Sequence, residues 1–276
     1  MALAHTRLIL TRPDPENQAW LQALTQANVK AVAWPLIQIG PNPQASAQLQ
    51  SAWQQLDQFK AAMFVSRPAV QHFFAARGTV STWPSATRAW CTGPGTRNAL
   101  LAQGVPAQLI DAPPSMGVYD TEHLWPVVQH QIQAQDTVLL VRGGEAAHAT
   151  HSAADVADSD PQASNGAGRD WLALQIQAQG AQVHWAVAYM RSCPTWGAEQ
   201  ISHALDAGTD GSVWLFSSSQ ALANLSALLP QQDWSKAKAL ATHARIAQRA
   251  QELGFGQVRM TQPTVEAVLA SIESGS

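Results

Sequence analysis

Short apolar runs alternate with amphipathic runs along most of the chain. The predicted strands cover residues 7–13, 61–66, 88–92, 107–110 and 137–143, and the predicted helices cover 15–28, 45–58, 68–77, 95–103 and 121–134. Asp14 is a suitable N-cap for the first helix, because its carboxylate accepts hydrogen bonds from free backbone N–H groups. Strands and helices that alternate in this way indicate parallel sheets with helices on both faces. The pattern therefore predicts an α/β fold.

Two distant parts of the chain carry the same series of patterns. Residues 61–76 (AAMFVSRPAVQHFFAA) and 213–228 (VWLFSSSQALANLSAL) each hold an apolar run, a Ser at its end and an Ala-rich amphipathic run. The other matching pairs are 86–104 with 238–254 and, out of order along the chain, 136–144 with 6–14. An internal duplication of this length predicts two similar α/β lobes with a site between them.

Two longer apolar runs stand where one lobe would pass to the other. VKAVAWPLIQI (29–39) is predicted to form a strand that continues past Pro35, and VHWAVAYMRS (183–192) a second long strand. The residues around 35–43 and 191–196 have the composition of linkers. These patterns leave open whether the lobes follow one another or the chain crosses between them twice.

Residues 145–168 interrupt the alternation. The segment EAAHATHSAADVADSDPQASNGAG consists of small and polar residues without an apolar period, which is typical of a flexible surface insertion. His148 and His151 have the spacing of a metal-binding pair, but no further ligands stand at a usable spacing. We therefore expect no metal site in this segment.

Composition narrows the classes of function. The 276 residues are 46% hydrophobic and 13% charged, with a formal net charge of −3, so two domains of ordinary size can each bury a core. No block of Lys and Arg indicates a nucleic-acid partner, and no apolar run reaches the ~18 residues of a membrane span. The N-terminus lacks the features of a signal peptide. Because Cys91 and Cys193 form no disulfide pattern, we expect a reduced, cytoplasmic protein.

Hydroxyl side chains recur where a predicted strand ends and a helix begins. They are Thr11, Ser66, Thr92, Ser217, Ser218 and Thr242. In an open parallel sheet this is the edge where ligands bind, and helix N-termini there attract carboxylates and phosphates. Any single one of these residues is better interpreted as an N-cap. The group as a whole favours a site for anionic groups.

The segment TGPGTRNA (92–99) invites a nucleotide-binding interpretation. Gly93 and Gly95 follow a strand, and Asp111 comes later, which is part of a dinucleotide-binding fingerprint. The match is partial, and the repeat counterpart of the segment, Thr242-His243-Ala244-Arg245, has no glycine. We interpret the glycines as a tight turn that brings backbone close to a ligand, with nucleotide binding as the less favoured alternative.

Three further residue types carry possible chemistry. Arg12 and Arg142 occupy equivalent strand ends in the repeat and are suited to clamp a carboxylate, although a structural or solvated role is equally compatible with the pattern. Cys91 has no base beside it and is expected to be a buried residue at a strand end. Tyr189, in AYMR (188–191), carries a phenol that can donate a proton to a leaving hydroxyl. The sequence alone favours a packing role for this tyrosine.

Several short motifs in order resemble the uroporphyrinogen-III synthase family. They are LTRP (10–13), FVSRPAV (64–70), TGPGT (92–96), YDTEHL (119–124), LLVRGG (139–144), GRDWLA (168–173), AYMR (188–191), FSSSQAL (216–222) and THARIAQRAQELG (242–254). Each motif is permissive alone, but their order and spacing are specific together, and they extend over nearly the whole chain.

The resemblance implies an architecture and a reaction. The fold would consist of two similar flavodoxin-like lobes with parallel sheets, joined by a two-stranded linker that the chain crosses twice. Lobe 1 would comprise residues 1–37 and 190–276, and lobe 2 residues 40–186. The reaction is that of a lyase, which cyclises hydroxymethylbilane with inversion of ring D and loss of water in haem, sirohaem and cobalamin biosynthesis. The family uses no cofactor or metal.

The resemblance, with the strand-end pattern, selects candidate site residues. The substrate contacts would be Arg12, Ser66, Gly93, Thr96, Arg142, Gly143, Ser217, Ser218, Thr242 and His243. Tyr189 would assist the loss of water, and its change to Phe would cost more than a single change at a hydroxyl. The protein would be a cytoplasmic monomer in transient contact with hydroxymethylbilane synthase.

Two other functions remain alternatives. A bilobal protein that closes on an anionic small molecule shares the duplication and the linking strands, but such proteins are usually exported and no signal is recognised here. A nucleotide-dependent two-lobe transferase would use residues 93–96 as a phosphate loop.

Overall fold

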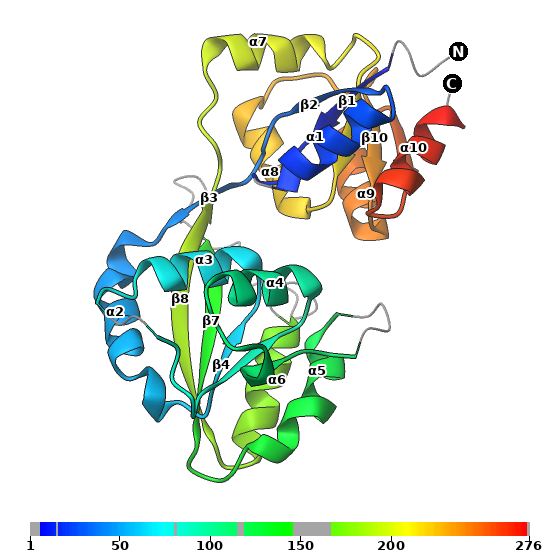
Figure 1. The fold of residues 1–276 in the computed structure, drawn as a ribbon. Coiled ribbons are helices and arrows are strands. Elements are labelled where there is room, and N and C mark those ends of the chain that lie inside the picture. Colours follow the sequence, from blue (N-terminus) through cyan, green and yellow to red (C-terminus); the bar gives the residue numbers. More distant parts are fainter. Residues whose placement is uncertain (1–5, 15, 80–81, 115–118, 146–166, 275–276) are drawn as a thin grey trace. The chain divides into compact units, whose positions relative to one another are not determined.

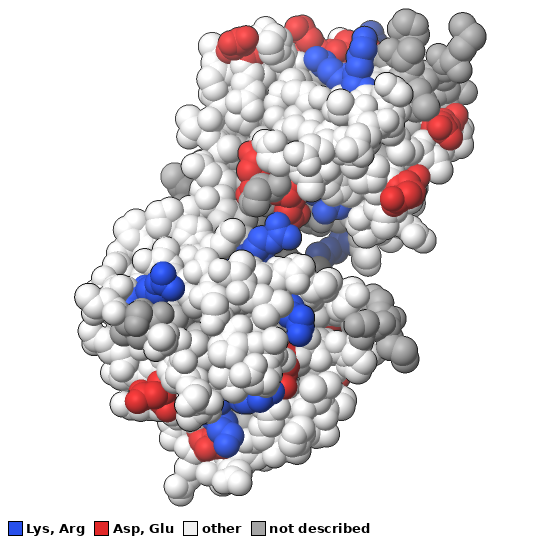
Figure 2. Space-filling model, in the orientation of Figure 1, with Lys and Arg blue, Asp and Glu red and all other residues white. Residues whose placement is uncertain are grey.

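The chain forms two compact units, each with its own sheet (Figure 1). The computed structural model describes residues 6–14, 16–79, 82–114, 119–145 and 167–274. Unit 1 comprises Met1–Ile39 and Ser192–Ser276, and unit 2 comprises Gly40–Arg191. Uncharged residues make up most of the face shown in Figure 2, in keeping with the 13% of charged residues in the sequence.

Unit 1 is built on a five-stranded sheet with the order β11-β10-β9-β1-β2. Its strands are β1 (Arg7–Leu10), β2 (Lys30–Ala33), β9 (Val213–Phe216), β10 (Lys238–Ala241) and β11 (Gln257–Met260). All neighbouring strands in this sheet are parallel. The carboxyl ends of the strands therefore meet at one edge.

Helices cover both faces of this sheet, because successive strand side chains point to opposite faces. The helices of unit 1 are α1 (Glu16–Gln26), α7 (Ala198–Asp206), α8 (Ser219–Leu228), α9 (Ala244–Glu252) and α10 (Val265–Glu273). On one face, Trp214 and Phe216 of β9 pack in a core with residues of α7, α8 and α9. On the other face, Val213 and Leu215 share a core with α1 and α10.

Unit 2 is built on a six-stranded sheet with the order β3-β8-β7-β4-β5-β6. Its strands are β3 (Gln38–Pro41), β4 (Ala61–Phe64), β5 (Arg88–Cys91), β6 (Ile110–Asp111), β7 (Thr137–Glu145) and β8 (Gln182–Ser192). The strands from β8 to β6 are parallel to their neighbours. This sheet therefore also gathers strand carboxyl ends at one edge.

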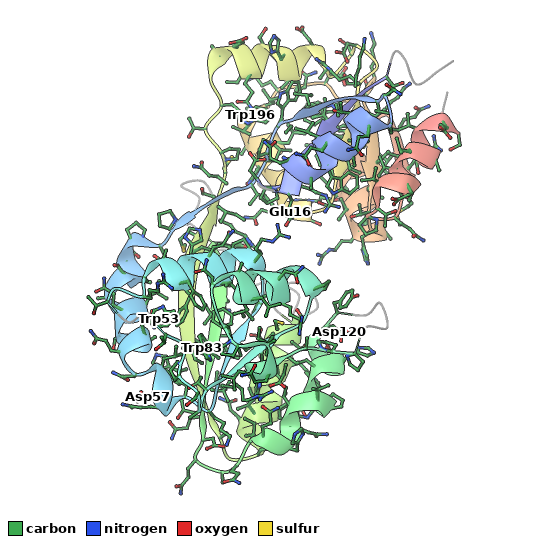
Figure 3. All side chains as sticks on the ribbon, in the orientation of Figure 1. Glu16, Trp53, Asp57, Trp83, Asp120 and Trp196 are labelled. Carbon is green, nitrogen blue, oxygen red and sulfur yellow. The ribbon has the colours of Figure 1, made fainter. Side chains whose placement is uncertain are left out.

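The helices of unit 2 are α2 (Ser46–Gln54), α3 (Arg67–Ala75), α4 (Pro94–Ala102), α5 (Thr121–Val128) and α6 (Ala167–Ala178). Leu140 and Met63 of the sheet pack with α5 and α6 in one core. On the other face, Phe64 contacts Phe73 of α3. Trp53 of α2 stacks on Phe73 at a centroid distance of 4.9 Å, and Trp83 lies 6.1 Å from Trp53 (Figure 3).

The strand orders confirm the predicted duplication. Across the sheet of unit 1 the strands lie in the order β2-β1-β9-β10-β11. Numbered by their order in the chain, they read 2-1-3-4-5, which is the flavodoxin-like arrangement. The five parallel strands of unit 2 lie in the order β8-β7-β4-β5-β6, which gives the same arrangement if β7 is taken as the first strand, β8 as the second and β4 as the third. The equivalent strands are those that match in sequence. The repeat is out of order along the chain because unit 2 is a circular permutation of unit 1.

The long strand predicted for residues 29–39 is wrong. The segment divides into β2 and β3, which belong to different sheets, and the residues between them are not in a strand. Pro35 lies at the break, where its missing N–H prevents a continuous ladder. The second long strand is confirmed, since β8 extends from Gln182 to Ser192. The strand predicted at 7–13 ends earlier, at Leu10.

The predicted insertion lies mostly outside the described residues. Of residues 145–168, the structure describes Glu145 at the end of β7 and the backbone of the first residues of α6. His148 and His151 fall outside the described part of the chain. In the described part, no helix has the length and apolar character of a membrane span.

Candidate functional site

Each sheet has two neighbouring strands whose following connections run to opposite sides of the sheet. Ligands of open α/β sheets bind there, outside the carboxyl ends of the strands. In unit 1 these strands are β1 and β9, and in unit 2 they are β7 and β4. Arg12 and Ser217 follow the two strands of unit 1, while in unit 2 Ser66 follows β4 and Arg142 lies within β7, which continues to Glu145. The strand-end pattern of the sequence thus selected residues at both places.

In unit 2 the predicted residues Ser66, Gly143 and Tyr189 come together. The parallel register of β7 and β8 shifts between Arg142 and Gly143, so that Gly143 pairs with Tyr189. Ser66 is the N-cap of α3 and accepts a hydrogen bond from the N–H of Ala69 at 3.3 Å. Its Oγ lies 3.2 Å from the hydroxyl of Tyr189. A strand-end hydroxyl and the phenol therefore share one hydrogen bond.

The phenol of Tyr189 is enclosed, with 1% of the residue exposed. Its ring stacks on His72 of α3 at a centroid distance of 5.9 Å. Burial lowers the pKa of His72 below its ordinary value, so the imidazole is neutral at neutral pH. Nη2 of Arg191 donates to the Tyr189 hydroxyl at 3.2 Å. The guanidinium carbon of Arg191 lies 5.8 Å from the centroid of the same ring.

Gly143 and Gly144 leave the space that this arrangement needs. A Cβ on Gly143 would overlap Cζ of Tyr189 and lie 2.8 Å from its hydroxyl oxygen. A Cβ on Gly144 would lie 2.8 Å from Val187 and 2.9 Å from the sulfur of Met190. These glycines are therefore explained by packing against β8, whether or not a ligand touches them.

The glycine-rich segment forms the start of α4. Gly93 is the N-cap of this helix and supplies no side-chain cap, and Pro94 occupies the first helical position. Thr96 is only 7% exposed. Arg67, which sequence reasoning missed, lies over this turn, because its Nη2 would be 3.2 Å from a Cβ on Gly95. The turn presents backbone N–H groups beside a cation.

The two repeated arginines each rest on a tryptophan. The guanidinium carbon of Arg142 lies 4.7 Å from the ring centroid of Trp185, and that of Arg12 lies 4.7 Å from that of Trp20. Nη1 of Arg12 is 3.6 Å from the Glu16 carboxylate. Nε and Nη2 of Arg12 and Nε of Arg142 are buried without a hydrogen-bond partner among the described residues. Burial lowers the pKa of Arg12, with Glu16 opposing the effect; the guanidinium stays charged.

The remaining predicted residues of unit 1 lie at the carboxyl edge of its sheet. Ser217 and Thr242 are half-buried. Ser218 caps α8 and accepts from the N–H of Gln220 at 3.2 Å. His243 caps α9, where its Nδ1 accepts from the N–H of Arg245 at 3.3 Å. Both the N-cap interpretation and the anion-site interpretation are compatible with these positions.

Thr11 does not belong to this group of hydroxyls, and its inclusion was wrong. The residue is 1% exposed, and its Oγ1 donates to the carbonyl of Leu215 at 2.6 Å. The hydroxyl thus joins β1 to β9 inside the sheet. A sequence pattern cannot distinguish this cross-strand bond from an exposed strand end.

Sequence reasoning also missed Arg191 as a partner of Tyr189. A signal was present, because residues i and i+2 of a strand share one face. AYMR within a predicted strand therefore places both side chains on the same side. His72 carried no comparable signal, since its contact with Tyr189 depends on how α3 packs on the sheet.

Unit 1 also contains a hollow of about 470 Å³. Its lining includes Asp14, Ile37, Gln38, Pro194 and Trp196, the last of which is labelled in Figure 3. The predicted site residues are absent from this lining. Among the described residues, no group of three or more His, Cys, Asp or Glu side chains is arranged to hold a metal ion.

We expect the two thiols to differ sharply in reactivity. Cys91 is 0% exposed, and burial raises its pKa to about 12, whereas Cys193 is half-buried and its pKa is raised less. Because the thiolate is the reactive form, a disulfide reagent at neutral pH should label Cys193 first and Cys91 only after unfolding. A Cys193→Ser variant should show no labelling in the native state. Rapid native labelling of that variant would contradict the enclosed position of Cys91.

Comparison with known proteins gives concordant results. Residues 18–150 and 162–270 match the family model for Uroporphyrinogen-III synthase HemD. The chain is similar to a mutant uroporphyrinogen III synthase of the extremely thermophilic bacterium Thermus thermophilus, with 14% identity, a TM-score of 0.52 and 98% of each chain covered. It is also similar to the uroporphyrinogen-III synthetase from Helicobacter pylori, with 16% identity, a TM-score of 0.51, and 98% of this chain and 100% of that chain covered.

Proposed function

This chain belongs to the uroporphyrinogen-III synthase family, and we infer that it cyclises hydroxymethylbilane to uroporphyrinogen III. The reaction inverts ring D and releases water, and the enzyme is a lyase of tetrapyrrole biosynthesis. The family match over most of the sequence is the observation that carries this conclusion. The flavodoxin-like sheets, permuted between the two units, agree with it.

The chemistry makes the enzyme mainly a conformational catalyst. Loss of the hydroxyl from the hydroxymethyl group on ring A, at the opposite end of the linear substrate from ring D, leaves an electrophilic azafulvene. Attack through the substituted carbon of ring D gives a spiro intermediate, which fragments and recloses with the ring reversed. The linear substrate also closes without help and without inversion. The protein must therefore hold the two ends of the substrate so that the inverted closure is faster.

The protein has a net charge of −3, so a polyanionic substrate would be bound by hydrogen-bond donors and cations placed at the site itself. The acetate and propionate groups would meet the N-terminal ends of α3, α4, α8 and α9, where free N–H groups and the helix dipole favour anions. Arg12 and Arg142 would add charge at equivalent strand ends. Their buried N–H groups without described partners support this assignment.

Tyr189 would supply the proton that leaves with the hydroxyl. The phenol is held by Ser66 and Arg191, within hydrogen-bond reach of a residue at the carboxyl edge of the sheet. Its geometry suits proton transfer at a fixed position. We further propose that units 1 and 2 act as the two lobes, and that the enzyme works in the cytoplasm as a monomer in transient contact with hydroxymethylbilane synthase.

The test of this function is the identity of the product isomer. The purified chain, incubated with hydroxymethylbilane without added metal or cofactor, should yield the type III isomer after oxidation of the product. Heat-denatured protein serves as the control and should leave only the type I isomer. If folded protein also gives only type I, the assignment is rejected.

A further inference from the structure

The hydroxyl of Tyr189 cannot meet a substrate directly in this structure. The residue is 1% exposed, while a proton donor must come within about 3 Å of the atom that it protonates. Two polar partners of the phenol oxygen are described, namely Nη2 of Arg191 and Oγ of Ser66, each at 3.2 Å. A proton from Tyr189 must therefore pass through a neighbour.

The donor and acceptor roles in this group follow from chemistry. A guanidinium has N–H donors and no acceptor, so Arg191 donates and the Tyr189 oxygen accepts. The phenol proton then has one described acceptor, Ser66 Oγ. The reverse orientation, with Ser66 donating, would leave the phenol proton buried without a described partner, which is unfavourable. The bond between the two hydroxyls thus runs from Tyr189 to Ser66.

Ser66 is the last group in this chain of hydrogen bonds, and its own hydroxyl proton has no described acceptor. A serine hydroxyl has one donor and two acceptor positions. Oγ accepts from Tyr189 and from the N–H of Ala69 at 3.3 Å, so both acceptor positions are used. The hydroxyl proton remains available for another molecule. Ser66 is half-buried and stands at the N-terminus of α3, on the carboxyl edge of the sheet.

We propose that Arg191, Tyr189 and Ser66 form a proton relay in which the Ser66 hydroxyl protonates the leaving oxygen of the substrate. The proposal deepens the function proposed above and rests on it. Ser66 would be the catalytic residue that touches the substrate. Tyr189 supplies its proton, and Arg191 is a positioning residue that stabilises negative charge on the phenol oxygen.

The relay balances over one turnover. As the C–O bond of the hydroxymethyl group breaks, the oxygen keeps the electron pair, takes the proton of Ser66 and leaves as water. Ser66 takes the proton of Tyr189, and the phenolate faces the guanidinium of Arg191 while ring A, which carried the hydroxymethyl group, bears the positive charge of a protonated azafulvene. The ring carbon that forms the final C–C bond later releases one proton. That proton returns through Ser66 to Tyr189.

The surroundings of the phenol favour this charge distribution. From β8, Arg191 places a positive charge on it. From α3, the stacked ring of His72 is neutral, because burial lowers its pKa. Glu145 of β7 pairs in register with Arg191, but no ion pair between their side chains is described. Arg142 of β7 lies against Trp185 instead.

A double-mutant cycle tests the serial arrangement. Ser66→Gly and Tyr189→Phe should each lower kcat about tenfold, with KM changed by less than about twofold, because each removes a group that acts in the transition state. The double variant should be no worse than about twofold below the slower single variant, since both changes break the same path. Multiplied losses of about a hundredfold, or full turnover of Ser66→Gly, would overturn the relay.

Glycine is chosen at position 66 because it keeps the start of α3. A glycine at an N-cap destabilises a helix much less than an alanine does. Thr264→Gly is the matched control, because Thr264 caps α10 and accepts from the N–H of Ala267 at 3.3 Å, the same bond that Ser66 makes. The control should lose a similar amount of stability and keep its kcat. If its kcat falls as far as that of Ser66→Gly, cap loss explains both effects.

Two substitutions at position 191 test the role of its charge. Arg191→Gln should lower kcat about tenfold with KM changed by less than about twofold, because it removes the cation beside the phenol oxygen, whereas Arg191→Lys should keep most of the turnover. Equal losses in the two variants, or full turnover of Arg191→Gln, would overturn the role of Arg191. Absence of the type III isomer with unaltered protein would instead reject the proposed function.

Discussion

Gly143→Ala is expected to lower turnover about tenfold or more, at least as much as Tyr189→Phe, because a shift of about 1 Å takes a catalytic group out of position. The new Cβ would overlap Cζ of Tyr189 and lie 2.5 Å from its Cε2. The ring cannot move aside freely, since it is buried and stacked on His72. Either β7 or the phenol must shift, which separates the Tyr189 hydroxyl from Ser66.

Gly40→Ala is the matched control for this change. A Cβ at Gly40 meets nothing within 4 Å, so this variant should keep its turnover and its melting temperature. Steady-state kinetics and thermal unfolding of both variants decide the matter. A Gly143→Ala enzyme with full kcat would show that the position of the Tyr189 ring is unimportant for the reaction.

Gly256→Ala should produce the largest loss of stability, about 3 kcal/mol of unfolding free energy, as expected for severe overpacking. A Cβ at this position would overlap the carbonyl oxygen of Ser235 and lie 2.7 Å from its carbon. Both are backbone atoms, so no side-chain rotation relieves the overlap. The N–H of Gly256 also donates to the carbonyl of Trp234 at 3.1 Å. Trp234 stacks on Phe255 at 4.9 Å, which ties the loop to the core of unit 1.

Denaturant unfolding measures this effect, with Gly197→Ala as the control in the same unit. Gly197 has nothing within 4 Å of an added Cβ and a φ of −76°, so alanine fits there. The control should lose less than about 1 kcal/mol, because only a glycine N-cap is replaced. A loss that small for Gly256→Ala would mean that the Ser235 loop adapts at little cost.

The proposed site of unit 2 would attract anions through partly buried cations, where many anion-binding proteins use surface charge. The cations Arg142 and Arg191 lie over aromatic rings, which hold the guanidinium groups without neutralising them. By contrast Arg88, at the opposite end of β5, forms an ion pair with Asp111. We therefore expect the carboxyl edge of this sheet to remain attractive to anions even though the protein as a whole is acidic.

The sequence by itself determined the elements and their repetition. Apolar runs of strand length and helical periods are local properties, so they can be recognised without knowledge of partners. The N-cap roles of Ser66 and Ser218 are local for the same reason, because a cap bonds to backbone within three residues. The duplication was visible because equivalent elements in both units face the same packing requirements. Together these signals established the α/β class, while the order and spacing of the short motifs indicated the family.

The tertiary structure alone decided how the chemical groups meet. Ser66 and Tyr189 are 123 residues apart in sequence, and they join because β4, β7 and β8 are neighbours and the register shifts at Gly143. Thr11 is buried because its hydroxyl bonds to the neighbouring strand β9, so this hydroxyl does not face a ligand. The division of residues 29–39 between two sheets likewise depends on which strands pair. Strand order and register arise from contacts between distant segments, and a local pattern of polar and apolar residues does not specify them.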